Sequence, residues 1–253
     1  MSNNTKLNQY ERGMVAGAEP FGRAYEEIGK KCSDIGSHVD DLDEKYDNII
    51  SALHPNDYAE IRKRQKKEKE ELNSAILLFM RNNVKDAYAI FDNLIKNNCA
   101  AACYYNGDIN YYGYSGYPVN ILASVNLFEI GAENNDVLCK LKLAEFFPNR
   151  LPRGCSQTDM YRNVQENIRK LAGSGSAISP IYQYEMGHMY EYGLNFDINP
   201  EMAFRYYKMA AEAKYFKGIF ALYKCYAEGF GVEEDLNKAR LYLDECNKMG
   251  YKG

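Results

Sequence analysis

Apolar residues recur at helical spacing along most of the chain, and in its last third the whole pattern repeats every 36 residues. This displacement superimposes glycines, alanines and tyrosines without a gap, in the pairs Gly193 and Gly229, Ala203 and Ala239, Tyr190 and Tyr226, Tyr206 and Tyr242, and Tyr215 and Tyr251. A fixed period of about 20–50 residues is typical of stacked repeats. The pattern therefore predicts an all-α solenoid in which each unit holds two helices and a turn.

Residues that start and stop helices repeat in the same register. The first helix of one unit is predicted to end at Gly193, because glycine readily adopts the positive φ of a helix C-terminal cap. Asn199 followed by Pro200 predicts the start of the second helix, and Asp235 stands at the equivalent position 36 residues later. Small residues such as Gly187 allow the paired helices to approach closely.

Earlier units follow the same pattern less strictly. A displacement of 80 residues places Gly107 under Gly187, Gly113 under Gly193 and Ala123 under Ala203. A weaker unit lies between, with apolar positions at helical spacing at Leu138, Leu141, Ala144, Val164, Ile168 and Leu171. A leading unit is predicted from helices near 72–80 and 83–98. The predicted solenoid covers 69–253, with units at about 70–98, 99–134, 135–174, 177–213 and 214–250.

The region before the solenoid has a different pattern. Residues 1–20 are polar, and 21–68 are predicted to be helical, with Leu42, Tyr46, Ile49 and Leu53 on one face before His54 and a charged helix from about Asp57. Terminal units of a solenoid need capping, because their outer faces lack a neighbour. We therefore interpret 21–68 as an N-terminal helical cap.

The charges argue against nucleic acid as a partner. The chain has 31 Lys and Arg against 35 Asp and Glu, a net charge of -4, so no general field attracts it to a polyanion. The basic run from Arg62 to Lys67 is followed by Glu68, Glu70 and Glu71, which favours ion pairs along one helix over a nucleic-acid patch.

No apolar run has the length of a signal peptide or a membrane span. We therefore expect a cytoplasmic protein without a membrane partner. The seven cysteines are irregularly spaced, which fits reduced thiols in the core better than disulfides.

Candidate chemistry is sparse. Cys99 and Cys103 lie one helical turn apart, as two metal ligands would, but packing in a helix is the favoured interpretation because no second pair of ligands is evident. His188 has no Ser or Cys signature around it that indicates a nucleophile and its base, and we expect it at the surface. We predict no catalytic residue, no metal site and no cofactor.

Tyrosine is unusually frequent, with 23 residues and no Trp. Six of these tyrosines are clustered at Tyr104, Tyr105, Tyr111, Tyr112, Tyr114 and Tyr117. About half are expected in the core and the others at the surface, where tyrosine provides contact area at low entropic cost.

Two runs of the sequence identify the type of repeat. MGHMYEYGLNFDINPEMAFRYYKMAAEAKY and LYKCYAEGFGVEEDLNKARLYLDECNKMGY resemble Sel1-like repeats, with the match strongest at Gly229, Gly231, Val232, Asp235, Lys238 and Ala239. The first run departs at Asn195 and Phe196, where the family has Gly and Val, so a differently shaped loop is expected there. The resemblance implies a right-handed α/α superhelix related to tetratricopeptide repeats.

The resemblance also implies a function. Such proteins bind other proteins, so we expect a non-catalytic module of a bacterial cytosol that acts as adaptor, regulator or toxin-neutralising immunity protein. Its partner is then an effector, toxin or regulatory protein. The first helices line the concave face, where register selects Tyr104, Asp108, Tyr111, Tyr184, His188, Glu191, Phe220 and Lys224 as partner-binding residues. Alternatives are a hydrolase of the cysteine-rich Sel1-like kind and a structural subunit of a larger assembly.

Overall fold

The computed structural model describes residues 55–251, with side chains from 59 onward. These residues form ten α-helices and no strand: α4 (Pro55–Met80), α5 (Val84–Lys96), α6 (Cys103–Tyr112), α7 (Ile121–Glu133), α8 (Val137–Phe146), α9 (Gln157–Ala172), α10 (Ser179–Tyr192), α11 (Pro200–Glu212), α12 (Phe216–Glu228) and α13 (Leu236–Lys248). The predicted all-α class is confirmed. Within residues 55–251, no helix has both the length and the apolar character needed to cross a bilayer.

The chain divides into two compact units, Met1–Glu71 and Leu72–Gly253. In the first unit, the described residues belong to the first part of α4, where Lys66 and Lys67 form i,i+4 ion pairs with Glu70 and Glu71. The predicted pairing of the basic run along one helix is thus confirmed. The apolar face predicted at Leu42, Tyr46, Ile49 and Leu53 lies outside the described residues.

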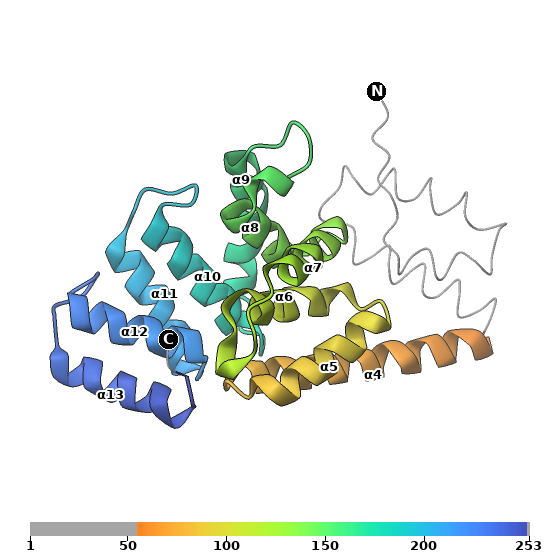
Figure 1. Ribbon diagram of the computed structural model, residues 1–253, viewed down its shortest axis with the longest axis horizontal. Coiled ribbons are helices and arrows are strands. Elements are labelled where there is room, and N and C mark those ends of the chain that lie inside the picture. Colours follow the sequence, from red (N-terminus) through yellow and green to blue (C-terminus); the bar gives the residue numbers. More distant parts are fainter. Residues whose placement is uncertain (1–54, 252–253) are drawn as a thin grey trace. The chain divides into compact units, whose positions relative to one another are not determined.

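The second unit is a stack of helix pairs (Figure 1). Helices α6 and α7, α8 and α9, α10 and α11, and α12 and α13 form successive antiparallel pairs, and each helix packs mainly on its neighbours in the chain. This arrangement is the predicted α/α solenoid. The leading helix differs from expectation, because α4 runs unbroken to Met80 and joins the two helices predicted near Asp57 and at 72–80.

The predicted helix caps are confirmed. The side chains of Asn199 and Asp235 accept hydrogen bonds from the backbone N–H groups of Met202 and Lys238, both at 3.0 Å. Gly193 ends α10 in the left-handed conformation, at φ 68°. The cap residues therefore set where the paired helices begin and end.

The register predicted for the pair α6–α7 is wrong by one residue in its second helix. Ser124 is fully buried as Ala203 is, whereas Ala123 is only partly buried. The extra residue lies in the loop after Gly113, since Gly116, Asn195 and Gly231 then align, with φ values of 81°, 61° and 70°. Asn195 thus takes the backbone conformation of the glycine it replaces, contrary to the expectation of a different loop shape; Asn tolerates this conformation better than most residues.

Close approach between paired helices depends on glycine. A Cβ atom at Gly187 would lie 2.6 Å from the ring of Tyr207, and one at Gly107 would lie 2.5 Å from the ring of Phe128. The same ring-on-glycine contact therefore recurs in two pairs. It occurs between each first helix and the second helix of the same pair.

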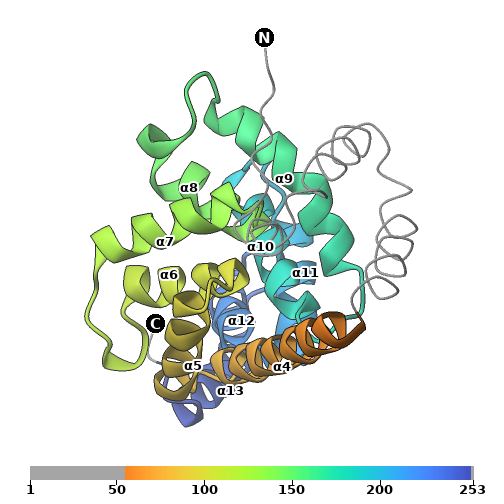
Figure 2. The same cartoon turned by 90° about the vertical axis from the view of Figure 1, so that its right-hand side faces the viewer.

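The C-terminal end of α4 meets the last pair of the stack, at the start of α12 and just after the end of α13 (Figures 1 and 2). The rings of Phe79 on α4 and Phe216 on α12 lie 5.6 Å apart, and the Asn82 amide donates a hydrogen bond to the Met249 carbonyl oxygen at 2.9 Å. The stack therefore curves tightly enough to bring its two ends into contact. As a result, side chains on the first helices face one another across the inside of the curve.

Candidate partner-binding face

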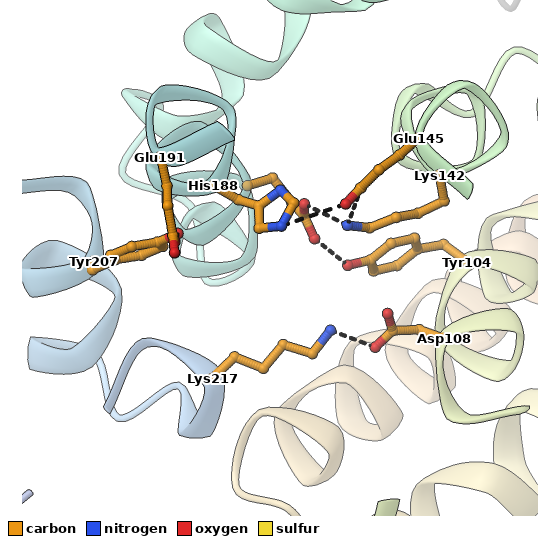
Figure 3. A network of polar contacts seen from close by, with 9 residues as sticks. Tyr104, Asp108, Lys142, Glu145, His188, Glu191, Tyr207 and Lys217 are labelled. Atoms are coloured by element: carbon orange, nitrogen blue, oxygen red, sulfur yellow. Dashed lines mark hydrogen bonds and ion pairs between the residues drawn. The ribbon is translucent and has the colours of Figure 1, made fainter. Parts of the chain in front are cut away.

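Charged side chains from four helices form a buried network on the inner face of the stack (Figure 3). The helices are α6, α8, α10 and α12, the first helix of each pair. The network contains Tyr104, Asp108, Lys142, Glu145, Glu185, His188 and Lys217. Because burying a charge is costly unless it is paired, the pairing inside this network controls its stability.

Glu185 connects three of the helices. Its carboxylate accepts hydrogen bonds from the Tyr104 hydroxyl and the Lys142 ammonium group, both at 2.8 Å, and its side chain is fully buried. Burial pushes the pKa of Glu185 up, but the positive charges of Lys142 and Lys217 outweigh it and leave the pKa below its usual value. Burial likewise pushes the pKa of Lys142 down, and Glu145 and Glu185 reverse the effect.

Asp108 and Lys217 form a second buried pair, between α6 and α12. Their charged atoms lie 2.6 Å apart, and 4% of the Lys217 side chain is exposed. The ammonium group also lies 5.0–5.4 Å from the ring centroids of Tyr112, Tyr114 and Tyr184. Burial raises the pKa of Asp108 and lowers that of Lys217, while their mutual attraction opposes both changes.

His188 extends the network toward solvent. Its Nε2 atom lies 3.4 Å from a Glu145 oxygen, and 12% of its side chain is exposed. The imidazole lies between Tyr184 and Tyr192, whose ring centroids are 6.2 Å and 4.5 Å away. Burial lowers the pKa of His188 despite the attraction of Glu145. The predicted surface position is thus replaced by a mostly buried one.

This lowered pKa predicts a pH dependence of stability. A histidine whose pKa is lower in the folded chain takes up more protons when unfolded, so its contribution to stability is complete above about pH 6.5 and is lost as the pH falls toward the folded pKa. We expect His188→Gln to reduce the slope of the free energy of unfolding against pH below about 6.5, by at most about 1.4 kcal/mol per pH unit. Urea unfolding from pH 7.5 to 5 measures the slope; an unchanged slope would contradict this assignment.

Two predicted binding residues do not lie on an open face. Tyr104 and Asp108 are fully buried, because the curvature of the stack brings α10 and α12 over them. Their positions on the first helix are as expected, but their side chains bind Glu185 and Lys217 instead of facing solvent.

The other six predicted residues are at least partly accessible. Tyr111 stacks on Phe146 at 4.2 Å, and Glu191 accepts a hydrogen bond from the Tyr207 hydroxyl. Tyr184 and His188 lie within the aromatic surroundings of the network, whereas Phe220 and Lys224 lie together further along α12, 5.8 Å from ring centroid to ammonium nitrogen. The structure therefore places three of the eight residues, Tyr104, Asp108 and His188, in the network, and Tyr184 packs beside it.

Several residues of this face were not predicted. Lys142 and Glu145 lie on α8, in the weak unit, and Lys217 lies in the first turn of α12. One signal was present: Lys142 stands between Leu141 and Leu143 in the apolar part of α8, where a buried charge needs a partner. The aromatic cluster behaved as expected, since Tyr104, Tyr105 and Tyr114 are buried and the other three tyrosines are more accessible.

The predicted core cysteines are also found. Five cysteines are buried, namely Cys99, Cys103, Cys139, Cys225 and Cys246. Among the described residues, no group of three His, Cys, Asp or Glu side chains is arranged to hold a metal ion.

Comparison with known proteins identifies the repeat. The Sel1 repeat model matches residues 100–136, 180–215 and 220–245. These segments hold the pairs α6–α7, α10–α11 and α12–α13.

Solved structures similar to this chain include a Sel1 repeat protein from Oxalobacter formigenes, which is 20% identical, with 83% of each chain covered and a TM-score of 0.39. Another is c5321, a protective antigen of uropathogenic Escherichia coli strains with an SLR fold, 18% identical, with 77% of this chain and 41% of that chain covered and a TM-score of 0.33. No curated protein matches the chain. The chain therefore contains three Sel1 repeats, which form three of the helix pairs of its α/α stack.

Proposed function

We propose that this chain is a non-catalytic module that binds another protein on the inner face of its first helices. Sel1 repeats generally mediate binding between proteins. In this proposal, the module acts as adaptor, regulator or toxin-neutralising immunity protein in a bacterial cytosol. The structural observation that carries it is a row of aromatic side chains on the solvent side of the buried network, in which Tyr112 and Tyr192 are exposed.

The row runs across three first helices. It contains Tyr111 and Tyr112 on α6, Phe146 on α8, and His188 and Tyr192 on α10. Tyr112 is 42% exposed and Tyr192 is 56% exposed. We call these five residues the aromatic row. Tyrosine is one of the residue types enriched among the side chains that contribute most of the binding energy at protein interfaces.

The aromatic row is held in place before any partner arrives. Tyr111 and Phe146 stack with an interplanar angle of 9°, and His188 packs against Tyr192 at 4.5 Å between ring centroids. Beneath them, Lys142 lies 5.2 Å from the Phe146 ring centroid. Since these rings are already ordered, binding would cost little side-chain entropy. A preordered aromatic surface supports a binding role.

Site-specific cross-linking tests this proposal. With the photoreactive residue benzoylphenylalanine at position 192 of the full chain in its native cells, we expect a discrete protein adduct on illumination. The same residue at position 241, where Leu241 is 67% exposed on α13, is the matched control. Adducts formed equally from both positions, or only from position 241, would contradict binding at the aromatic row.

A further inference from the structure

Lysines of this chain repeatedly occupy sites made of an aromatic ring and a carboxylate. Lys142 lies over Phe146 and pairs with Glu185. Lys217 lies over three tyrosine rings and pairs with Asp108. In the last pair of helices, Lys238 lies 5.2 Å from the Tyr226 ring centroid and 3.1 Å from an Asp235 oxygen. A ring face and a carboxylate together attract a cation more strongly than either does alone.

The accessible end of the aromatic row also combines an aromatic ring with a carboxylate, but no lysine occupies it. Glu191 and Tyr192 end α10 beside His188, and Glu191 accepts a hydrogen bond from the Tyr207 hydroxyl. Burial raises the pKa of Tyr192, and the neighbouring Glu191 raises it further. Within residues 55–251, Glu191 forms no ion pair, and the ammonium group of Lys224 lies over Phe220 without an ion pair of its own.

Near the network, the carboxylates outnumber the lysines that pair with them. Lys142 and Lys217 pair with three carboxylates, those of Asp108, Glu145 and Glu185, whereas the Glu191 carboxylate contacts the Tyr207 hydroxyl. The carboxylate that remains without a cation is Glu191, next to the most exposed ring of the aromatic row. A partner group that complements this end of the face is therefore positively charged and planar or compact enough to lie against a ring.

We propose that Glu191 and Tyr192 form a subsite that binds a cationic side chain of a protein partner, arginine in preference to lysine. This inference rests on the proposed function and specifies its chemistry. A guanidinium group is planar, so it stacks on the Tyr192 ring while two of its N–H groups donate to the Glu191 carboxylate. An ammonium group can make one of these contacts well but lacks the flat face and the paired donors.

Nuclear magnetic resonance with a small probe tests the subsite directly. The probe is Nα-acetyl-arginine amide, and the reporter is the His188 Hε1 signal in the full chain labelled at histidine. The sequence holds only three histidines, so this signal is assigned with His188→Gln. Because His188 packs on Tyr192, a group stacking on that ring shifts the signal. We expect a saturable shift with the arginine probe, a weaker one with Nα-acetyl-lysine amide and none with the uncharged Nα-acetyl-citrulline amide.

Variants separate the charge from the fold. Glu191→Gln keeps an oxygen that accepts the Tyr207 hydrogen bond but removes the charge, and we expect it to weaken binding of the arginine probe about tenfold or more. The control Glu212→Gln changes a carboxylate that is 66% exposed on α11, and the affinity should not change. An equal shift with the citrulline probe, or unchanged affinity in Glu191→Gln, would overturn the subsite. Adducts at position 192 alongside such a result would leave the proposed function standing and reject only its cationic subsite.

Discussion

Lys142→Met is expected to reduce the free energy of unfolding by about 3–5 kcal/mol. Lys142 is 1% exposed and pairs with Glu185 at 2.8 Å and with Glu145 at 3.1 Å. Methionine has a similar volume, so the core loses little packing. The cost arises because Glu185 keeps its charge in a fully buried position after losing the ammonium group that neutralises it. Urea unfolding followed by circular dichroism measures the loss.

Two further variants make the cause identifiable. Lys140→Met alters a partly accessible lysine on the same helix, and its expected effect is within about 0.5 kcal/mol. Glu185→Gln removes the stranded charge and still accepts the Tyr104 hydrogen bond, so the double variant with Lys142→Met should show a favourable coupling of about 1–3 kcal/mol. If Lys142→Met were no more harmful than Lys140→Met, the ion pairs would contribute nothing to stability.

Much of the fold could be predicted because the residues that begin and end each helix lie close to that helix in the sequence. Asn199 and Asp235 cap helices through their own side chains, and Gly193 ends one through its backbone, so each signal acts within a few residues. The register of α7 was predicted wrongly because such local signals do not fix the number of residues in the loop between two helices. An extra residue in the loop after Gly113 leaves both helix patterns intact and shifts only their offset.

The candidate site was less predictable because it depends on curvature. The partner-binding residues were predicted from their positions in the repeat, which assumes that every first helix faces solvent. In the structure, Asp108 meets Lys217 across 109 residues of sequence, and Tyr104 meets Glu185 across 81. No local pattern encodes such a contact. The weak pair α8–α9 adds to the difficulty, because Lys142 lies in a unit whose motif is faint.

Two glycines of the last loop offer a test of how neighbouring units hold together. Gly229 and Gly231 both have positive φ, at 67° and 70°. A Cβ atom at Gly229 would meet nothing closer than 3.6 Å, whereas one at Gly231 would overlap the Pro200 carbonyl oxygen at the start of α11. The two positions thus share one backbone conformation and differ in their contact with the preceding pair of helices.

Gly229→Ala is therefore expected to cost about 1–2 kcal/mol, from backbone conformation alone. Gly231→Ala carries the same cost and also forces the loop away from α11, which should bring the total to about 3–5 kcal/mol. Because the stack is stabilised by contacts between neighbouring pairs, Gly231→Ala should weaken the interface between the pair α12–α13 and the preceding pair α10–α11. Urea unfolding of both variants measures the difference, and protease cleavage within 214–251 should accelerate only in Gly231→Ala. Equal losses in the two variants would mean that the loop contact with Pro200 does not help to join the last two units.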